Sequence, residues 1–280
     1  MRKRVLVTVL TYPCPSHKYI ETVCTAGVTE EGKWIRVYPL QQRYLGKKIQ
    51  KWNWYDFDLE QRPSQKDLRR ESYHCLSMPD RSSGFIPSKD NWSERRHYCI
   101  DNVEVYRTIE EWEKAIVVEE GKRPSSLGTF KPASILNFEA VPVDTTNLDK
   151  EKQEILDNLY SQLDLFEEEK KELRNQYWKM AESIPYRFYY RFRDFSGVEK
   201  RLMIEDWEVF ELYRKCRDNY CRTEEEAIAK VREKYLDEFS KKDIYFFLGT
   251  RLEQHRRRLK TPYSIIGVFY PSKNEQLSMF

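Results

Sequence analysis

The chain has 280 residues, of which 40% are hydrophobic and 14% aromatic, so it is long and apolar enough to form a substantial core. Its 49 basic and 46 acidic residues leave a net charge of +3, which excludes a uniformly basic nucleic-acid coat protein; any cationic site must arise from local segregation of charge. The sequence shows no secretory signal and no apolar run of the roughly 18 residues that a membrane span needs, and its six cysteines form no CxxC pair, so we expect a cytoplasmic protein with reduced thiols and no membrane contact.

Short β-rich runs dominate the first half of the chain. The run at 4–11 predicts a buried strand that ends at two prolines, Pro13 and Pro15, because proline cannot continue strand pairing. Two further runs flank Glu30-Glu31-Gly32 and predict a hairpin with Gly32 in the turn. The remaining elements expected in this half are strands at 54–61, 97–106 and 130–143, and a helix at 108–120.

Residues 147–178 differ in character, because they contain neither glycine nor proline and their apolar residues recur with a helical period. The apolar positions are Ile155, Leu159, Leu163, Phe166, Leu173 and Tyr177. The pattern predicts one long amphipathic helix, or two helices separated near Phe166. The helix could pack on its own domain, connect two domains or bind a protein partner. Its acidic surface argues against contact with nucleic acid.

The stretch PYRFYYRFRD at 185–194 alternates an aromatic side with an arginine and tyrosine side, as expected of a half-buried strand. A three-residue loop, 195–197, would pair this strand with VEKRLMIE, and Gly197 suits the positive φ angle of such a loop. This register predicts four opposing pairs: Phe192 with Lys200, Tyr190 with Leu202, Phe188 with Ile204, and Arg193 with Glu199. The aromatic side should therefore lie in the core, with Arg187, Tyr189 and Arg191 facing outwards.

Two helices and two apolar strands complete the chain. Asp206 is expected to cap the first helix and Thr223 the second. Strands are expected at 243–250 and 263–271. The elements together predict an α+β protein with two β-rich, mostly antiparallel, small-barrel-like modules, a long connecting helix and a helical pair in the C-terminal half. We place the domains at 1–146, 147–178 and 179–280.

Basic residues interleaved with aromatic residues favour a nucleic-acid-binding function, because arginine and lysine hold phosphates and aromatic rings stack on bases. Trp34, Arg36 and Tyr38 share one side of a strand, and Trp92 with Arg95 and Arg96 repeats the combination on a short helix. The segment 251–260 carries five cations and one acid. The candidate binding residues are Lys18, Trp34, Arg36, Tyr38, Lys47, Lys48, Arg187, Tyr189, Arg191, Arg251, His255, Arg256, Arg257, Arg258 and Lys260.

The alternative function is that of a metal-dependent nuclease or nucleotide-processing enzyme, with Asp56, Asp58 and His255 as its catalytic residues. Clustered carboxylates can hold Mg²⁺, and histidine can act as a general acid or base. The sequence lacks the acid-x-lysine partner that nucleases of this type use, and the spacing of its histidines and cysteines is not that of a zinc site. We therefore favour a non-catalytic binding protein, without a metal or cofactor, in nucleic-acid metabolism or in defence against foreign DNA. A protein-interaction subunit built on 147–178 is the third alternative.

The segments TYPCPSHKYIETVCTAGVTEEGKWIRVYPL, MIEDWEVFELYRKC and YFFLGT, with the final PYSIIGVFYP, are similar to those of a family of bacterial hypothetical proteins. The resemblance covers nearly the whole chain. This family has no established activity, so the resemblance implies no catalytic residues. The alternation of short strands in both halves also resembles small β-barrel modules of the OB or PUA-like kind, which is an analogy of architecture alone.

Overall fold

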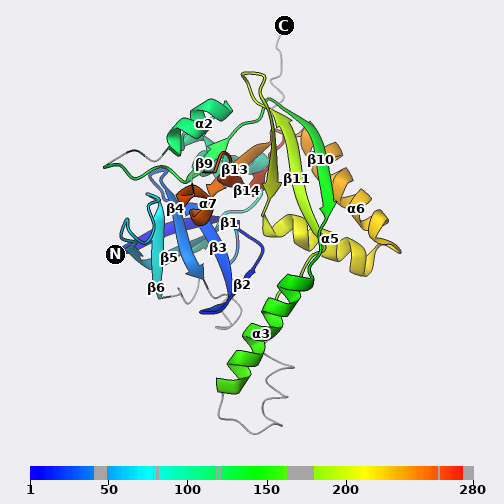
Figure 1. Cartoon of the computed structure of the whole chain (residues 1–280). Coiled ribbons are helices and arrows are strands. Elements are labelled where there is room, and N and C mark those ends of the chain that lie inside the picture. The colour runs from blue at the N-terminus through cyan, green and yellow to red at the C-terminus, as the bar shows by residue number, and fades with distance from the viewer. Residues whose placement is uncertain are drawn as a thin grey trace.

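The computed structural model describes residues 1–40, 49–77, 79, 82–117, 119, 121–162, 180–257 and 259–273. In these residues two seven-stranded sheets form the body of the protein, and one helix, α3, extends away from both (Figure 1). The first sheet contains β1 (Arg2–Leu10), β2 (Cys14–Ser16), β3 (Ile20–Val28), β4 (Trp34–Leu40), β5 (Asn53–Gln61), β6 (Ser72–Ser77) and β7 (Gly84–Phe85).

Strand β1 closes the first sheet into a barrel by pairing along both of its edges. Its first part pairs with β5 and its last part with β3, which gives the circular order β1-β3-β4-β6-β5. Strands β4 and β6 are parallel, whereas the other neighbours in the circle are antiparallel. If β2 and β7 are set aside and the five strands are numbered along the chain, the order is 1-2-3-5-4-1, which is the strand order of an OB-fold barrel.

The second sheet repeats this order. It contains β8 (Val105–Tyr106), β9 (Leu127–Phe130), β10 (Ser134–Pro142), β11 (Tyr186–Arg193), β12 (Glu199–Ile204), β13 (Tyr245–Thr250) and β14 (Tyr263–Phe269). The path runs β10-β11-β12-β14-β13-β9-β8, with β12 and β14 parallel. Only 131–133 separate β9 from β10, so the two are halves of one bent strand. Counted as one strand they give the order 1-2-3-5-4-1 again, and two barrel-like modules are therefore present, as the sequence predicts.

The predicted register of β11 and β12 is confirmed. All four predicted pairs are present, and Gly197 in the connecting loop has a φ angle of 89°. Phe188, Tyr190 and Phe192 are fully buried, whereas Arg187 and Arg191 are exposed. A slip of one residue would move the aromatic side into water, so burial of these three rings specifies the pairing.

Strand β1 is covered on both sides, which explains its nearly continuous apolar sequence. Val5 and Val7 belong to the core of the first barrel. Val9 packs in a separate cluster with Phe247 and Phe269 of the second sheet. The two barrels thus share an apolar contact, and β1 lies at its centre.

The helices that the structure describes lie mainly between strands of the second sheet along the chain. They are η1 (Asp90–Trp92), α1 (Ser93–Arg96), η2 (His97–Asp101), α2 (Ile109–Ala115), α3 (Thr146–Gln162), α5 (Trp207–Asn219), α6 (Glu224–Arg232), η3 (Glu233–Glu238), η4 (Phe239–Lys241) and α7 (Leu252–Arg256). The predicted helical pair is α5 and α6, and both predicted caps are present: Asp206 accepts the Glu208 amide and Thr223 the Glu226 amide. No helix of the described residues is long and apolar enough to cross a membrane.

Two predictions in the middle of the chain differ from the structure. The strand expected at 97–106 is largely the helical turn η2, and only β8 at its end is extended. Strands β8, β9 and β10 pair within the second sheet, so the division between sheets falls near residue 105, not at the predicted boundary of 146. The pattern of residues identifies strands, but their partners lie far away in the sequence. Of the long helix expected at 147–178, the described part is α3.

Candidate nucleic-acid interface

In OB-fold barrels, strands 2 and 3 and the adjoining loops form the usual ligand-binding surface. In the first barrel these strands are β3 and β4, and their outer side is largely covered by the second barrel. The Trp34 ring meets Phe247 edge-on at 5.2 Å between centroids. Arg36 is only 4% exposed, and its Nη2 donates to the Ser126 carbonyl at 3.0 Å. Of the predicted row, only Arg36 is buried, and Trp34 and Tyr38 stay partly exposed; the Arg62 guanidinium lies 5.7 Å from the centroid of the Tyr38 ring.

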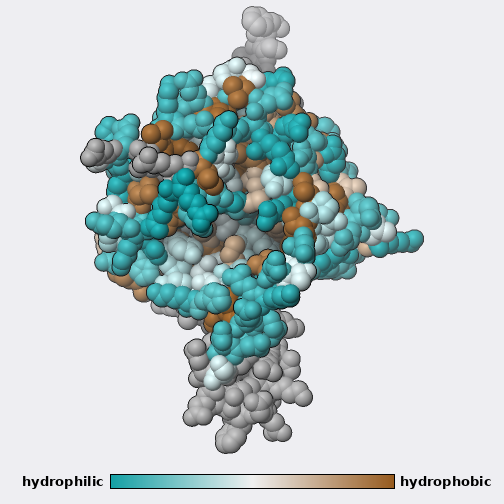
Figure 2. Space-filling model, in the orientation of Figure 1, coloured by the Kyte–Doolittle hydropathy of each residue, from teal (hydrophilic) through white to brown (hydrophobic). Residues whose placement is uncertain are grey.

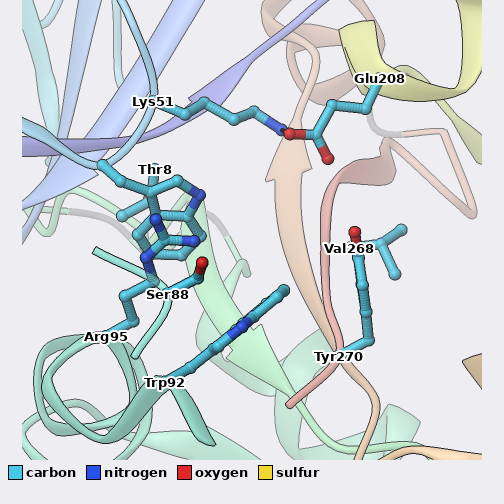
Figure 3. Close-up of a pocket in the computed structure, with 9 residues that line it drawn as sticks. Thr8, Lys51, Ser88, Trp92, Arg95, Glu208, Val268 and Tyr270 are labelled. Atoms are coloured by element: carbon cyan, nitrogen blue, oxygen red, sulfur yellow. Dashed lines mark ion pairs between the residues drawn. The ribbon is translucent and has the colours of Figure 1, made fainter. Parts of the chain in front are cut away.

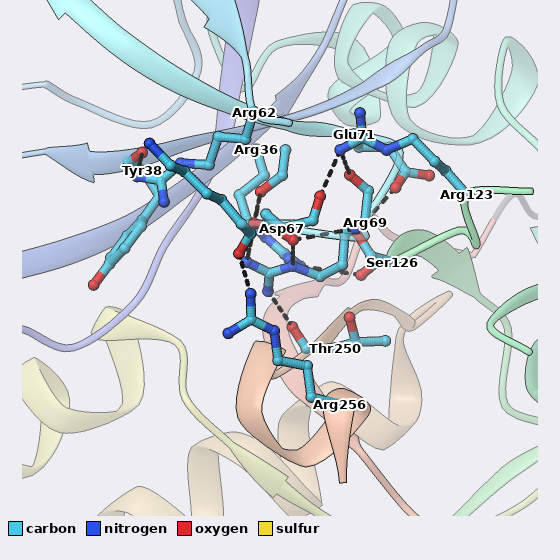
Figure 4. A network of polar contacts seen from close by, with 12 residues as sticks. Arg36, Tyr38, Arg62, Asp67, Arg69, Glu71, Arg123, Ser126, Thr250 and Arg256 are labelled. Atoms are coloured by element: carbon cyan, nitrogen blue, oxygen red, sulfur yellow. Dashed lines mark hydrogen bonds and ion pairs between the residues drawn. The ribbon is translucent and has the colours of Figure 1, made fainter. Parts of the chain in front are cut away.

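A network of buried hydrogen bonds and ion pairs holds this covered side against the second barrel (Figure 4). The Asp67 carboxylate accepts two hydrogen bonds from the Arg69 guanidinium, at 2.8 and 2.9 Å, and one from the Ser72 hydroxyl at 2.6 Å. Arg69 then donates from Nη1 to the Thr250 carbonyl at the end of β13, at 2.9 Å. Because these groups are withdrawn from water, every bond matters for stability. The network joins the two barrels and leaves its charged groups unavailable to a ligand.

Two charged groups at this covered side have pKa values that differ from their ordinary values. Burial alone would raise the pKa of Asp67, but hydrogen bonds from Arg69 and Ser72 lower it to about 2. Burial, together with the nearby charge of Arg69, lowers the pKa of Arg36 to about 9. The pKa shift of Asp67 comes from bonds within the first barrel, whereas that of Arg36 comes mainly from its burial where the two barrels meet.

In the second barrel the corresponding strands are β11 and β12, and their outer side is not covered in this way. Arg187, Arg191 and Arg193 are exposed on β11, and Tyr189 between them is half-buried. The guanidinium of Arg201, on β12, lies 3.6 Å from the centroid of the Tyr189 ring. We call this surface the open face and define it by Arg187, Tyr189, Arg191, Arg193 and Arg201 together with Arg251.

Carboxylates accompany most of these arginines. Glu139 of β10 lies 3.5 Å from Arg191 and 2.7 Å from Arg201. Arg193 pairs with Glu199 across the hairpin at 2.5 Å. These side chains are 22% to 52% exposed, and such pairs contribute little to stability, so an incoming phosphate can replace a carboxylate at small cost.

The basic segment 251–260 divides between structural and accessible residues. Arg251 pairs with Glu205 at 2.6 Å and also donates to the Met203 sulfur of β12, which places it at the margin of the open face. Arg256 donates to the carbonyls of Gln65 and Lys66 in the first barrel. The segment thus links the loops of the two barrels.

The other candidates in this segment are less closely tied to the body. Arg257 pairs with Glu253 at 2.5 Å, and Lys260 is exposed. Arg258 lies outside the described residues, as does the side chain of His255. Figure 2 shows that hydrophilic residues cover most of this side of the molecule, which is hollowed near its centre, beside the place where Figure 1 shows α7.

The remaining candidates are scattered. Lys18 is exposed, with its ammonium 5.0 Å from the Tyr19 ring centroid. Lys47 and Lys48 lie outside the described residues. Among the candidates that the structure describes, the cations do not form a single patch, and of these Arg187, Arg191 and Arg251 lie on the open face.

The carboxylates of the alternative enzyme function lie on β5, in the first barrel. Asp56 is 3.8 Å from Arg2, and Asp58 accepts a hydrogen bond from Ser77 at 3.1 Å. Neither contacts a histidine within the described part of the chain. In that part, no group of three or more histidine, cysteine, aspartate or glutamate residues is arranged to hold a metal ion.

The candidate binding residues did not include Arg193 and Arg201 of the open face, nor Glu139 beside it. Arg201 could have been found, because the predicted register places it opposite Arg191. Glu139 could not, because nothing in the sequence indicates that β10 pairs with β11.

Two family models match the chain. Residues 1–101 match a domain of unknown function (DUF8758), and residues 108–280 match another domain of unknown function (DUF8757). The two matches meet near residue 105, where the strands divide between the sheets. No curated protein and no solved structure matches the chain. Since the second model covers more than half of the chain, the protein belongs to the DUF8757 family, whose function is not established.

Proposed function

We propose that this protein binds single-stranded nucleic acid along the open face and that it does so without catalysis. The observation that carries the proposal is the position of the arginine and tyrosine side of β11 and β12. It is exposed on strands 2 and 3 of an OB-type barrel, where members of this fold bind single strands. A fold alone does not fix a function, and the charge and the aromatic group of this surface support the proposal independently of it.

The charge of the open face favours an anionic ligand. Its five arginines are accompanied by three nearby acids, Glu139, Glu199 and Glu205, so a positive excess remains. Within the described residues Arg187 has no acidic partner, and Glu139 is shared between two arginines. Arginine can donate two parallel hydrogen bonds to a phosphate, which suits it to a nucleic-acid backbone.

Tyr189 supplies a stacking group in the middle of these cations. Its ring is half-buried, so its orientation is fixed by the neighbouring strand, and Arg201 lies over it. A base can stack on the tyrosine ring or on the plane of the guanidinium, and each such contact is worth about 1–3 kcal/mol. This combination favours a single strand over a duplex, because only unpaired bases expose their faces.

A salt titration tests the proposal. Fluorescently labelled single strands of RNA and DNA, each about 15 nucleotides long, and the matched duplexes are titrated with the protein, and anisotropy is measured between about 50 and 300 mM salt. We expect single strands to bind more tightly than duplexes, with an affinity that falls steeply as salt rises. Absence of binding at the lowest salt, or an affinity independent of salt, contradicts the proposal.

A further inference from the structure

A cavity of about 220 Å³ lies where the two barrels and the η1–α1 segment meet (Figure 3). Its lining includes Thr8, Trp52, Trp92, Arg95, Glu208 and Tyr270. None of them belongs to the open face. The cavity is smaller than the usual pocket for a drug-sized ligand, so it suits a molecule about as large as a single base or nucleoside.

Aromatic rings form much of the wall. Trp92 packs against Tyr270 with ring centroids 4.9 Å apart, and it lies 6.4 Å from Trp52. The Arg95 guanidinium is 4.4 Å from the centroid of the Trp52 ring and 5.4 Å from that of Trp92. Flat, polarisable groups therefore face the cavity, and such groups bind a flat aromatic ligand by stacking.

The polar groups of the wall include both donors and acceptors. Arg95 is 6% exposed and donates from Nε and Nη2 to the Ile86 carbonyl, at 3.0 and 2.8 Å, so Nη1 has no partner among the described residues. Lys51, which also lines the cavity, is neutralised by the buried Asp206 at 2.6 Å and by Glu208 at 3.4 Å. Two cations and two carboxylates together give no excess charge to hold a simple anion. The Glu208 carboxylate, at 44% exposure, can accept hydrogen bonds from a ligand.

Thr8 gives an independent sign of a ligand. The residue lines the cavity and is 1% exposed, and its hydroxyl, which is itself buried, has no hydrogen-bond partner within the described residues. A buried hydroxyl without a partner costs about 1–3 kcal/mol, so such groups normally find one. A ligand in the cavity would supply it.

The backbone around the cavity is strained. Trp52 and Trp92 both have positive φ angles, of 65° and 60°, and so do Asp90 at 48° and Asn91 at 52°. Only one other non-glycine residue of the described chain, Ile20, has a positive φ. For a bulky residue this conformation is unusual, and such strain is concentrated at functional sites in proteins. Here it holds the two tryptophans that form the wall.

We propose that this cavity binds a nucleobase, which stacks on the tryptophan wall while Arg95, Glu208 and the Thr8 hydroxyl hydrogen-bond to its edge. The edge of a base carries both hydrogen-bond donors and acceptors, which match the donors and acceptors of the cavity wall, whereas the two carboxylates repel a free phosphate. The base can belong to a free nucleoside or nucleotide, or to an unstacked nucleotide of a strand. The proposal does not depend on binding at the open face.

Tryptophan fluorescence and calorimetry with the full chain test the proposal directly. The probes are the four common nucleosides, their 5′-monophosphates and inorganic phosphate. We expect at least one nucleoside to quench the fluorescence saturably with a dissociation constant below about 1 mM, and phosphate alone to have no effect. No saturable binding by any base, or phosphate binding as tightly as a nucleotide, overturns the proposal.

Paired threonine variants separate binding from folding. Thr8→Val removes the unpartnered hydroxyl and keeps the shape of the side chain, and we expect it to weaken nucleoside binding about threefold to tenfold. Thr25→Val is the matched control, because Thr25 is also fully buried with an unpartnered hydroxyl but does not line the cavity. Thr25→Val should change the nucleoside affinity by less than about twofold relative to the wild type, and neither variant should lower the unfolding temperature. Equal binding by the wild type and Thr8→Val contradicts the assignment.

Two further variants identify the source of the base and the surface used. Arg95→Met should weaken nucleoside binding more than tenfold while the circular dichroism spectrum stays unchanged. Arg187→Glu changes the open face and should leave nucleoside binding unchanged. Loss of nucleoside binding in this variant would contradict a cavity site that is independent of the open face. The Arg187→Glu variant is then titrated with short oligonucleotides and with nucleosides. If the oligonucleotides bind more tightly, and Arg95→Met removes this difference, the bound base belongs to a strand. Equal affinities show that the cavity binds a free base.

Discussion

The two barrels share one strand order but present the corresponding side of strands 2 and 3 to different surroundings. In the first barrel, Trp34 and Arg36 are packed against the second barrel. In the second barrel, Arg187 and Tyr189 remain on the surface. Both strands show the same alternation of aromatic and basic residues in the sequence. The sequence pattern therefore identifies one side of a strand, whereas the tertiary packing decides whether that side stays exposed or packs against a neighbouring barrel.

The two sides also differ in how they satisfy their charges. The covered side uses backbone carbonyls and a tight pair between Asp67 and Arg69, because a buried charge without partners is very costly. The open face uses exposed pairs such as Arg193 with Glu199, which exchange readily with solvent. Mutations on the first side should therefore change stability, and those on the second side should change binding.

The largest expected effect is on the covered side. Asp67→Asn leaves the Arg69 guanidinium buried without its carboxylate, so we expect the free energy of unfolding to fall by about 3–5 kcal/mol. Glu199→Gln, which removes the acid of an exposed pair, is the control and should change it by less than about 1 kcal/mol. Urea denaturation of the three proteins measures both values. Equal effects would show that the two sides do not differ as described.

The same variant has a defined pH dependence. The pKa of Asp67 is about 2 in the folded protein, below its ordinary value of 3.8, so its ionised form stabilises the fold above pH 3.8 and this contribution is lost as the pH falls towards 2. The difference in unfolding free energy between the wild type and Asp67→Asn should be constant from about pH 7 to 5 and shrink below about pH 4. A difference that grows on acidification contradicts the assignment.

A matched pair of aromatic variants compares the two sides directly. Trp34→Ala should lower the free energy of unfolding by about 2–3 kcal/mol, because it removes a ring packed on Phe247. Tyr189→Ala should weaken single-strand binding about tenfold, through loss of one stacking group, with a smaller effect on stability. Urea denaturation measures the stability of both variants, and fluorescence anisotropy measures their affinity for single strands. Loss of binding in Trp34→Ala at temperatures where it stays folded would place a ligand contact on the covered side.

A smaller effect is expected from a single charge on the open face. Arg187→Glu should lower the affinity for single strands about equally for every sequence and reduce the dependence of log affinity on log salt by about one. Arg256→Glu is a useful comparison, because Arg256 donates to backbone carbonyls of the first barrel. Its effect should fall mainly on the unfolding temperature. A salt dependence that Arg187→Glu leaves unchanged would remove Arg187 from the interface.

The smallest expected effect is a gain of affinity. Glu139→Gln removes the carboxylate that lies beside Arg191 and Arg201, so both guanidinium groups become more available to phosphates. We expect single-strand binding to strengthen about twofold to fivefold at low salt, with the gain disappearing at high salt because the interaction is screened. Weaker binding in this variant would show that Glu139 itself contacts the ligand.

Much of the local structure was predictable from the sequence. The register of β11 and β12 follows from their alternating pattern and a glycine-containing loop, and the helix starts follow from Asp206 and Thr223. The side of β11 that faces outwards was predicted for the same reason. These features depend on residues close together in the chain, where periodicity and capping act.

The contacts between distant segments were not predictable. The bond from Arg69 to the Thr250 carbonyl joins residues 181 positions apart, and the pair of Lys51 with Asp206 joins residues 155 apart. No pattern in either segment indicates its partner. The covering of Arg36, the strain at Trp92 and the cavity all arise from such contacts, so they became visible only in the folded protein.

Ultraviolet cross-linking of a bound single strand, followed by mass spectrometry of the peptides, tests most directly whether the open face is the interface. We expect adducts in β11 and β12, with Tyr189 among the modified residues, and we expect Tyr189→Ala to remove that adduct. Adducts confined to α3 or to the outer side of β5, with none in β11 and β12, would contradict binding at the open face.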